Sequence, residues 1–167
     1  MREEREKRIS DFMKRLDTLS TGERAVLKRS VGKMLREADA RAVAAFYRCY
    51  PVSESEERWF AAACMHCLGN DEGKTAKPLQ DILSDLRKEE ALSDSMQNRL
   101  TGLLDLKWDR DGYLLTKLAR MVKMVKAKGY VVDCGALLQD LLDWNNESQY
   151  VQRKWARSFY QGYQTKE

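Results

Sequence analysis

The apolar side chains of this chain recur at steps of three and four residues, which is the period of an amphipathic helix. In the range 5–19 this spacing produces one apolar stripe, made of Ile9, Phe12, Met13, Leu16 and Leu19. The alternating pattern of a half-buried strand never continues for more than a few residues. The pattern therefore predicts an all-α fold from one end of the chain to the other.

Start and stop signals divide this pattern into about nine helices. Ser20 followed by Glu23 is a capping box, and Asp39 and Asp133 are typical N-cap residues. Pro51 follows the third helix, and Gly129 follows the seventh. The second helix is expected to open at residue 20 and to turn Leu27, Val31, Met34 and Leu35 inward. The other expected helices are 5–19, 39–50, 56–68, 78–88, 93–106, 112–128, 133–144 and 148–163, with a short extended link at 131–132.

We expect these helices to form two small bundles, residues 1–93 and residues 94–167. The run 87–90 is polar on all sides, and the serines at 93–95 provide the next helix start. A competing boundary lies at residues 69–77, which collect Gly, Asn, Asp, Lys and Thr without an apolar period.

Positive charge is concentrated in two places, although the whole chain carries only +4. Residues 24–48 contain seven basic and two acidic side chains, and residues 112–129 contain five basic and none that are acidic. Exposed helices ordinarily mix both signs at three- and four-residue spacing, so these clusters favour the binding of a polyanion. Their basic residues are Arg24, Lys28, Arg29, Lys33 and Arg36 in the first, and Lys117, Arg120, Lys123, Lys126 and Lys128 in the second. In the expected helix 112–128 one side is apolar, made of Leu114, Leu115, Leu118, Met121, Val122 and Val125, and Lys117, Arg120, Lys123 and Lys126 step around the other.

These clusters can be an ordinary solvated helix face, and two functional interpretations also remain open. In the first, the protein binds nucleic acid through its phosphates. In the second, it is a helical adaptor between proteins, and a basic helix face meets an acidic partner. The two differ in their dependence on salt, which is steep when phosphates are bound.

Reactive side chains give little support to catalysis. His66 is the single histidine, and the chain has neither a G-x-S-x-G serine nor a glycine-rich phosphate loop. Cys64, His66 and Cys67 are good zinc ligands, but a second nearby pair is missing, so we expect buried helical cysteines. Asp140 and Asp143 share helical spacing and are interpreted as a polar helix face. We therefore predict no catalytic residue, no metal and no cofactor.

The aromatic side chains fall into two groups. Trp144, Trp155 and Phe159 occur at the spacing of a helix core. The last expected helix should bury Val151 with Trp155 and Phe159, and expose Arg153, Lys154 and Arg157. Trp108 and Tyr113 instead flank a polar loop, and they are candidates for stacking on unpaired bases.

No apolar run approaches the roughly 20 residues that a membrane span needs. The first ten residues are charged throughout, without the apolar stretch of a signal peptide. The four cysteines suit a reducing compartment, so we expect a cytoplasmic protein without a membrane partner.

Four segments, in this order, resemble the CasB family, the small subunit of the type I-E CRISPR surveillance complex called Cascade. They are GERAVLKR (22–29), AAFYRCYP (44–51), KLARMVKMVKAKGYVVDCGALLQDLLDW (117–144) and VQRKWARSFYQ (151–161). The resemblance implies a non-enzymatic protein of two helical bundles. It also implies several partners, namely other Cascade protein subunits, a second copy of itself, the guide RNA, and the target DNA with its displaced single strand.

Carried over to this chain, the family's basic contacts correspond to Lys28, Arg29, Arg99, Arg120, Arg153, Lys154 and Arg157. The two clusters add Lys33, Arg36, Lys117, Lys123 and Lys126. Contacts from Lys and Arg to phosphates carry no sequence information, which suits a surface that must accept any sequence.

Overall fold

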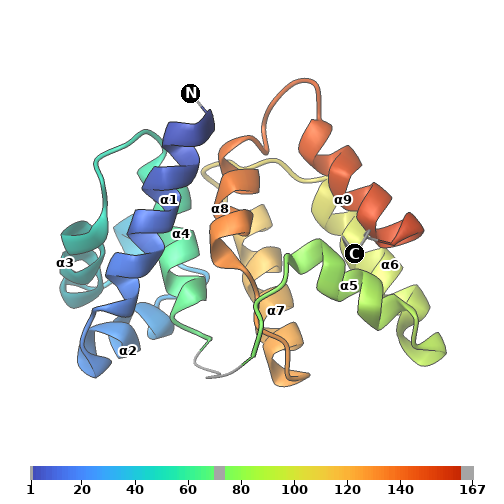
Figure 1. The fold of residues 1–167 in the computed structure, drawn as a ribbon, viewed down its shortest axis with the longest axis horizontal. Helices are drawn as coiled ribbons and strands as arrows, with labels where there is room; N and C mark the ends of the chain where they lie inside the picture. Colours follow the sequence, from blue (N-terminus) through green and yellow to red (C-terminus); the bar gives the residue numbers. More distant parts are fainter. Residues whose placement is uncertain (1, 70–73, 163–167) are drawn as a thin grey trace.

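The computed structural model describes residues 2–69 and 74–162, and within these ranges it contains nine α-helices and two 3-10 helices (Figure 1). The prediction of an all-α chain of about nine helices is confirmed. The helices are α1 (Arg2–Asp17), α2 (Thr21–Arg29), η1 (Leu35–Glu37), α3 (Ala40–Cys49), α4 (Glu56–His66), α5 (Leu79–Arg87), η2 (Glu90–Leu92), α6 (Ser93–Leu104), α7 (Tyr113–Ala127), α8 (Cys134–Leu142) and α9 (Tyr150–Gln161).

The predicted caps set several of these boundaries. The Ser20 hydroxyl accepts a hydrogen bond from the Glu23 backbone N–H, and the Glu23 carboxylate accepts one from the Ser20 N–H, both at 3.1 Å. The side chains of Asp39 and Asp133 each accept a backbone N–H three residues on, at 3.0 Å. These bonds satisfy donors that have no partner within the helix. The capping box and both N-caps are confirmed.

One helix is shorter than the apolar pattern suggested. Val31 and Met34 are buried as expected, but α2 ends at Arg29. The chain then turns through Gly32, whose φ of +88° is in the left-handed region that favours glycine. The turn buries the same side chains without continuing the helix.

The link after α7 is extended, as predicted, and it pairs with the segment before α5. The Lys77 N–H donates to the Val131 carbonyl at 2.9 Å, and the Asp133 N–H donates to the Lys77 carbonyl at 2.8 Å. This isolated parallel bridge joins two segments that the sequence keeps far apart.

The helices pack around one continuous hydrophobic core. α8 lies against α4 and α1, α2 lies against α3 and α4, and α5 packs against both α9 and α6 (Figure 1). α7 contacts α4 and α6, and in Figure 1 it is drawn behind α8. None of the helices in the described ranges has the length and the apolar character that a membrane crossing requires.

Contacts cross the predicted division at residue 93. α5 precedes the division but packs against α6 and α9, whereas α8 follows it but packs against α1 and α4. The boundary between bundles 1–93 and 94–167 stays a prediction.

Candidate nucleic-acid interface

The end of the first basic cluster lies against the helix that carries the second, although the two are far apart in the sequence. A Cβ atom added at Gly32 would be 3.4 Å from the Cβ atom of Ala119, so the turn after α2 rests directly on α7. Lys33 follows Gly32, and Arg120 follows Ala119. The close approach therefore brings the end of the first cluster beside the middle of the second.

Two further contacts extend this surface. The Arg36 guanidinium donates to the Arg110 carbonyl at 3.1 Å, which ties η1 to the loop before α7. On the other side, the Lys117 ammonium lies 3.4 Å from the position of a Cβ at Gly102, so it rests on α6, one turn from Arg99. We call the resulting surface the basic band, and it consists of Lys33, Arg36, Arg99, Lys117, Arg120 and Lys123.

The cations of the band have no ion-pair partner within the described part of the chain. All six side chains are exposed, and none of them forms an ion pair with a described carboxylate. Arg36 donates to a backbone carbonyl and Arg99 to the Ser95 hydroxyl, at 3.5 Å. Exposed cations of one sign at close spacing create a positive potential that attracts anions.

The other residues of the two clusters lie outside this band. Lys28 and Arg29 are exposed in the last turn of α2, just before the turn. Arg24 instead contacts Asp17 of α1, with 3.7 Å between guanidinium and carboxylate. Lys126 is half-buried and lines a pocket on another side of α7. A spacing of nine residues places it opposite Lys117 on the helix.

α9 carries a separate group of cations. Arg153, Lys154 and Arg157 are exposed, and Val151, Trp155 and Phe159 are buried, as the sequence predicted. α9 packs against α5, and no described hydrogen bond or ion pair joins its cations to the basic band. Arg153 donates to the Ser148 carbonyl.

Lys154 has an internal partner, because its ammonium pairs with the carboxylate of Asp140. The interpretation of Asp140 as a polar-face residue is wrong. Its side chain is only 5% exposed, and it also accepts a hydrogen bond of 2.8 Å from the Trp155 indole. The sequence offered one signal for this, since Asp140 stands between the buried leucines 138 and 141.

Asp143 is half-buried and forms a second link between distant helices. Its two oxygens accept hydrogen bonds from the Arg5 guanidinium at 2.9 and 3.0 Å, and one of them also contacts the Tyr150 hydroxyl. Burial raises the pKa of Asp143, but these hydrogen bonds and the positive charge of Arg5 lower it by more, so the pKa lies below its usual range. The link fastens α1 to the C-terminal part of the chain.

The cysteines and the histidine do not converge on a metal site in the described ranges. Cys64 is buried in α4, and burial raises the pKa of its thiol well above the usual value. Burial likewise raises the pKa of Cys67 to about 12. Thiols held in this protonated form are poor nucleophiles and poor metal ligands. The expectation of a buried helical cysteine is confirmed for Cys64.

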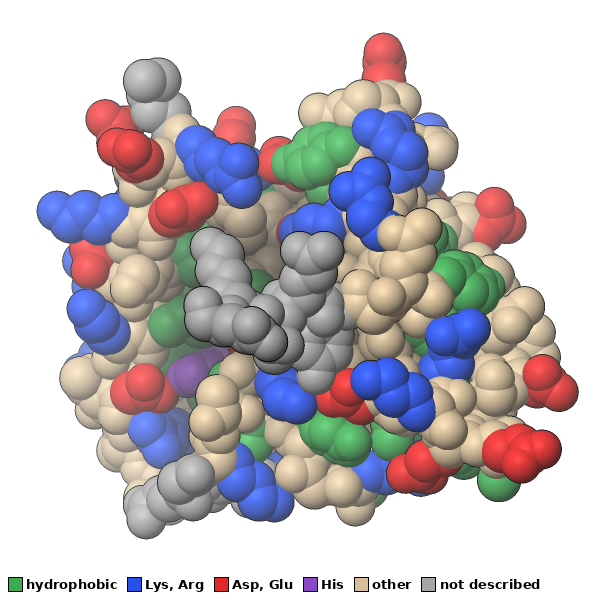
Figure 2. All heavy atoms as spheres, turned by 45° about the vertical axis from the view of Figure 1, so that its right-hand side comes forward, with side chains coloured by type: hydrophobic (Ala, Val, Ile, Leu, Met, Phe, Trp, Pro, Cys, Tyr) green, Lys and Arg blue, Asp and Glu red, His purple; other side chains and the backbone are tan. Residues whose placement is uncertain are grey.

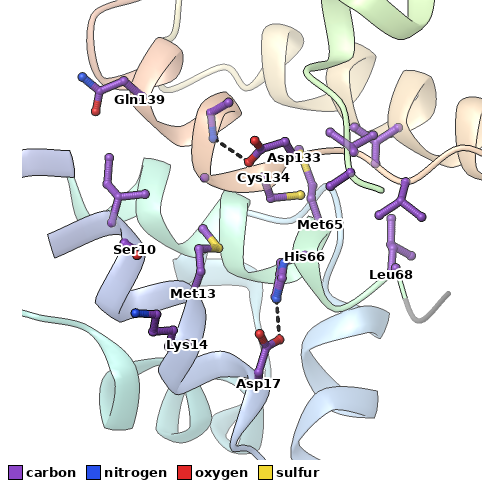
Figure 3. Close-up of a pocket in the computed structure, with 18 of the residues that line it drawn as sticks. Ser10, Met13, Lys14, Asp17, Met65, His66, Leu68, Asp133, Cys134 and Gln139 are labelled. Atoms are coloured by element: carbon purple, nitrogen blue, oxygen red, sulfur yellow. Dashed lines mark hydrogen bonds and ion pairs between the residues drawn. The ribbon is translucent and has the colours of Figure 1, made fainter. Parts of the chain in front are cut away.

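His66 lies in the wall of an apolar pocket of about 580 Å³ between α1, α4 and the start of α8 (Figure 3). Its imidazole nitrogen is 2.7 Å from the Asp17 carboxylate (Figure 3). Figure 2 shows hydrophobic side chains in the hollow next to the purple His66, with cations and anions interspersed over the rest of that face. The pocket is thus distinct in character from the basic band.

A comparison with family models gives one decisive match, because the model described as CRISPR-associated protein Cse2 covers residues 23–160. The chain belongs to the Cse2 family. A search of curated proteins gave no match.

Several solved structures share this fold. CasB from Thermus thermophilus is 27% identical with a TM-score of 0.72, over 93% of this chain and 97% of that one. CasB from M. ruber is 24% identical with a TM-score of 0.74, over 92% and 93% of the two chains. A chain from a structure described as a CRISPR RNA-guided surveillance complex is 22% identical with a TM-score of 0.74, over 95% and 94%.

Proposed function

We propose that this Cse2-family protein is a non-catalytic small subunit of a type I-E Cascade complex and that it holds nucleic acid without sequence preference. One observation carries the binding role. The basic band gathers cations from η1, α6, α7 and the turn after α2, and none of them is paired with a described carboxylate. The family and the shared fold with a chain of an RNA-guided surveillance complex support the assembly role.

In this mechanism the cations of the band neutralise phosphates and form no contacts that depend on the identity of the bases. Lysine and arginine contacts to phosphates position a strand but do not specify its sequence. Recognition belongs to base pairing between guide RNA and target DNA. A subunit that holds the displaced strand then slows re-closure of the DNA and stabilises the open loop. Its partners are the other protein subunits, the guide RNA, both DNA strands and a second copy of itself, in the cytoplasm.

The experiment compares two double variants with equal loss of charge. Arg120→Ala/Lys123→Ala removes two cations of the band, and Lys7→Ala/Arg41→Ala removes two exposed cations outside it, on α1 and α3. Binding of a single-stranded oligonucleotide is measured at several salt concentrations. For the wild type we expect dissociation constants on the order of 10⁻⁴ to 10⁻⁶ M near physiological salt.

The band variant is expected to lose about 0.7 of the log–log salt slope for each phosphate contact removed. The control variant should keep the wild-type slope. Equal slopes for both variants, or strong preference for one sequence at equal length, would contradict the proposal. If DNA does not bind but an acidic protein partner does, with a shallow salt dependence, the adaptor function is the correct one.

A further inference from the structure

Four tyrosines of the described chain expose much of their side chains, and three of them are already engaged. The ring of Tyr47 packs against Phe46 and its hydroxyl contacts Glu56, at 3.0 Å. The other two engaged tyrosines are Tyr150, whose hydroxyl binds Asp143, and Tyr160, whose ring packs against Phe159 and the Arg87 guanidinium.

Tyr113 differs from all three. It is 64% exposed, the largest value among these tyrosines. Within the described residues no aromatic ring or guanidinium covers its ring, and its hydroxyl has no hydrogen-bond partner. The Tyr113 ring is thus largely presented to solvent, without a ring, guanidinium or hydrogen-bond partner among the described residues.

The ring stands at one end of the basic band. Tyr113 opens α7, and Lys117 and Arg120 follow at four and seven residues, so all three lie on one face of the helix. Behind it, Gly112 approaches the Met34 methyl group, with 3.4 Å from an added Cβ. Arg36 is fastened to Arg110, three residues before Tyr113. The Tyr113 ring therefore lies near cations of the band that come from its own helix and from η1.

Trp108, the second stacking candidate, is in a different environment from Tyr113. It is half-buried, and the Arg58 guanidinium lies 5.6 Å from the centre of its ring. Its backbone N–H and carbonyl are both bonded to the Asn145 side chain, at 2.9 and 2.7 Å. The structure thus leaves Tyr113 as the candidate with an accessible ring.

We infer that Tyr113 is a stacking platform for one unpaired base of a strand whose phosphates lie on the basic band. Aromatic rings stack on any base, whereas the bases of a duplex are already stacked and paired, so the platform favours single strands over double strands. The inference rests on the proposed function, because the band has to hold the strand near the ring. Asp111 is exposed two residues before Tyr113 and repels phosphate. The sugar-phosphate backbone of the bound strand therefore runs from the ring towards Lys117.

The test uses the full chain with Tyr113→Ala, Tyr113→Phe and, as a matched control, Thr116→Ala, an exposed neighbour on the same helix. Affinity is measured at one salt concentration for a single-stranded oligonucleotide carrying 2-aminopurine and for a duplex of equal length. Loss of one stacked base corresponds to a weakening of about fivefold to a hundredfold. We expect this loss for Tyr113→Ala with the single strand alone, together with loss of 2-aminopurine quenching. Tyr113→Phe and Thr116→Ala should retain wild-type affinity.

An unchanged single-strand affinity in Tyr113→Ala overturns the inference, as does an equal weakening for single strand and duplex. The salt slope separates this failure from failure of the proposed function. If Arg120→Ala/Lys123→Ala lowers the slope while Tyr113→Ala leaves single-strand affinity intact, the band binds phosphates and the stacking role is wrong. If the wild-type chain binds neither oligonucleotide, both proposals fall together.

Discussion

Replacing Lys154 with Ala tests whether this cation serves stability rather than nucleic-acid binding. Its ammonium and the Trp155 indole are the two partners of the Asp140 carboxylate, whose side chain is 5% exposed. Without Lys154, a buried negative charge keeps a single hydrogen bond. Removal of one partner from a fully buried ion pair costs about 3–5 kcal/mol, and an exposed pair contributes about 0–1 kcal/mol.

The cost of removing Lys154 should lie between these two energies, because 46% of its side chain is exposed. We expect a loss of about 2 kcal/mol in the free energy of unfolding, which lowers Tm by about 4–8 °C in a chain of this size. Arg157→Ala is the matched control, since Arg157 is an exposed cation on the same helix without a described ion pair. Its loss should change stability by less than about 0.5 kcal/mol.

A double-mutant cycle compares wild type, Lys154→Ala, Asp140→Asn and the variant with both changes, each unfolded by heat and by urea. Asp140→Asn keeps an oxygen that can accept the Trp155 N–H while it removes the charge. In that background, Lys154→Ala should cost less than about 0.5 kcal/mol, because no buried charge is left unpaired. Lys154 has no special role in stability if Lys154→Ala and Arg157→Ala have the same effect on the free energy of unfolding, or if the cost of Lys154→Ala is the same in the Asp140→Asn background.

Three further predictions concern α9, acid stability and the thiols. Arg153→Ala/Arg157→Ala should leave Tm unchanged and shorten the lifetime of the open DNA loop in the reconstituted complex; an unchanged lifetime would remove α9 from the interface. Because the pKa of Asp143 is lowered in the folded protein, this carboxylate contributes stability above its unfolded-chain pKa near 4, and that stability is lost as pH falls through the folded pKa. Acid unfolding of Asp143→Asn should therefore show a weaker pH dependence than wild type below about pH 4. Cys64 and Cys67 should react slowly with a thiol reagent at pH 8 in the native protein and rapidly in urea; rapid native labelling would contradict the raised pKa of these thiols.

Local signals in the sequence were sufficient for the helices and their apolar faces. The Ser20–Glu23 capping box, the Asp133 N-cap and the apolar face of 112–128 act within a few residues, so the sequence alone specifies them. The same periodicity showed which face of α7 and of α9 carries cations. The helical pattern did not predict the burial of Asp140, because burial of a carboxylate depends on partners supplied by another helix.

Tertiary structure decided which of these faces meet. The helical period shows that a face is apolar but not which helix covers it, because that depends on contacts between residues far apart in the chain. The fold places Gly32 against Ala119 and thereby joins two basic clusters, whereas the same packing turns Lys126 towards an apolar pocket. It also separates Tyr113 from Trp108, which the sequence treated alike, because Arg58 of α4 reaches one ring while the other remains in solvent.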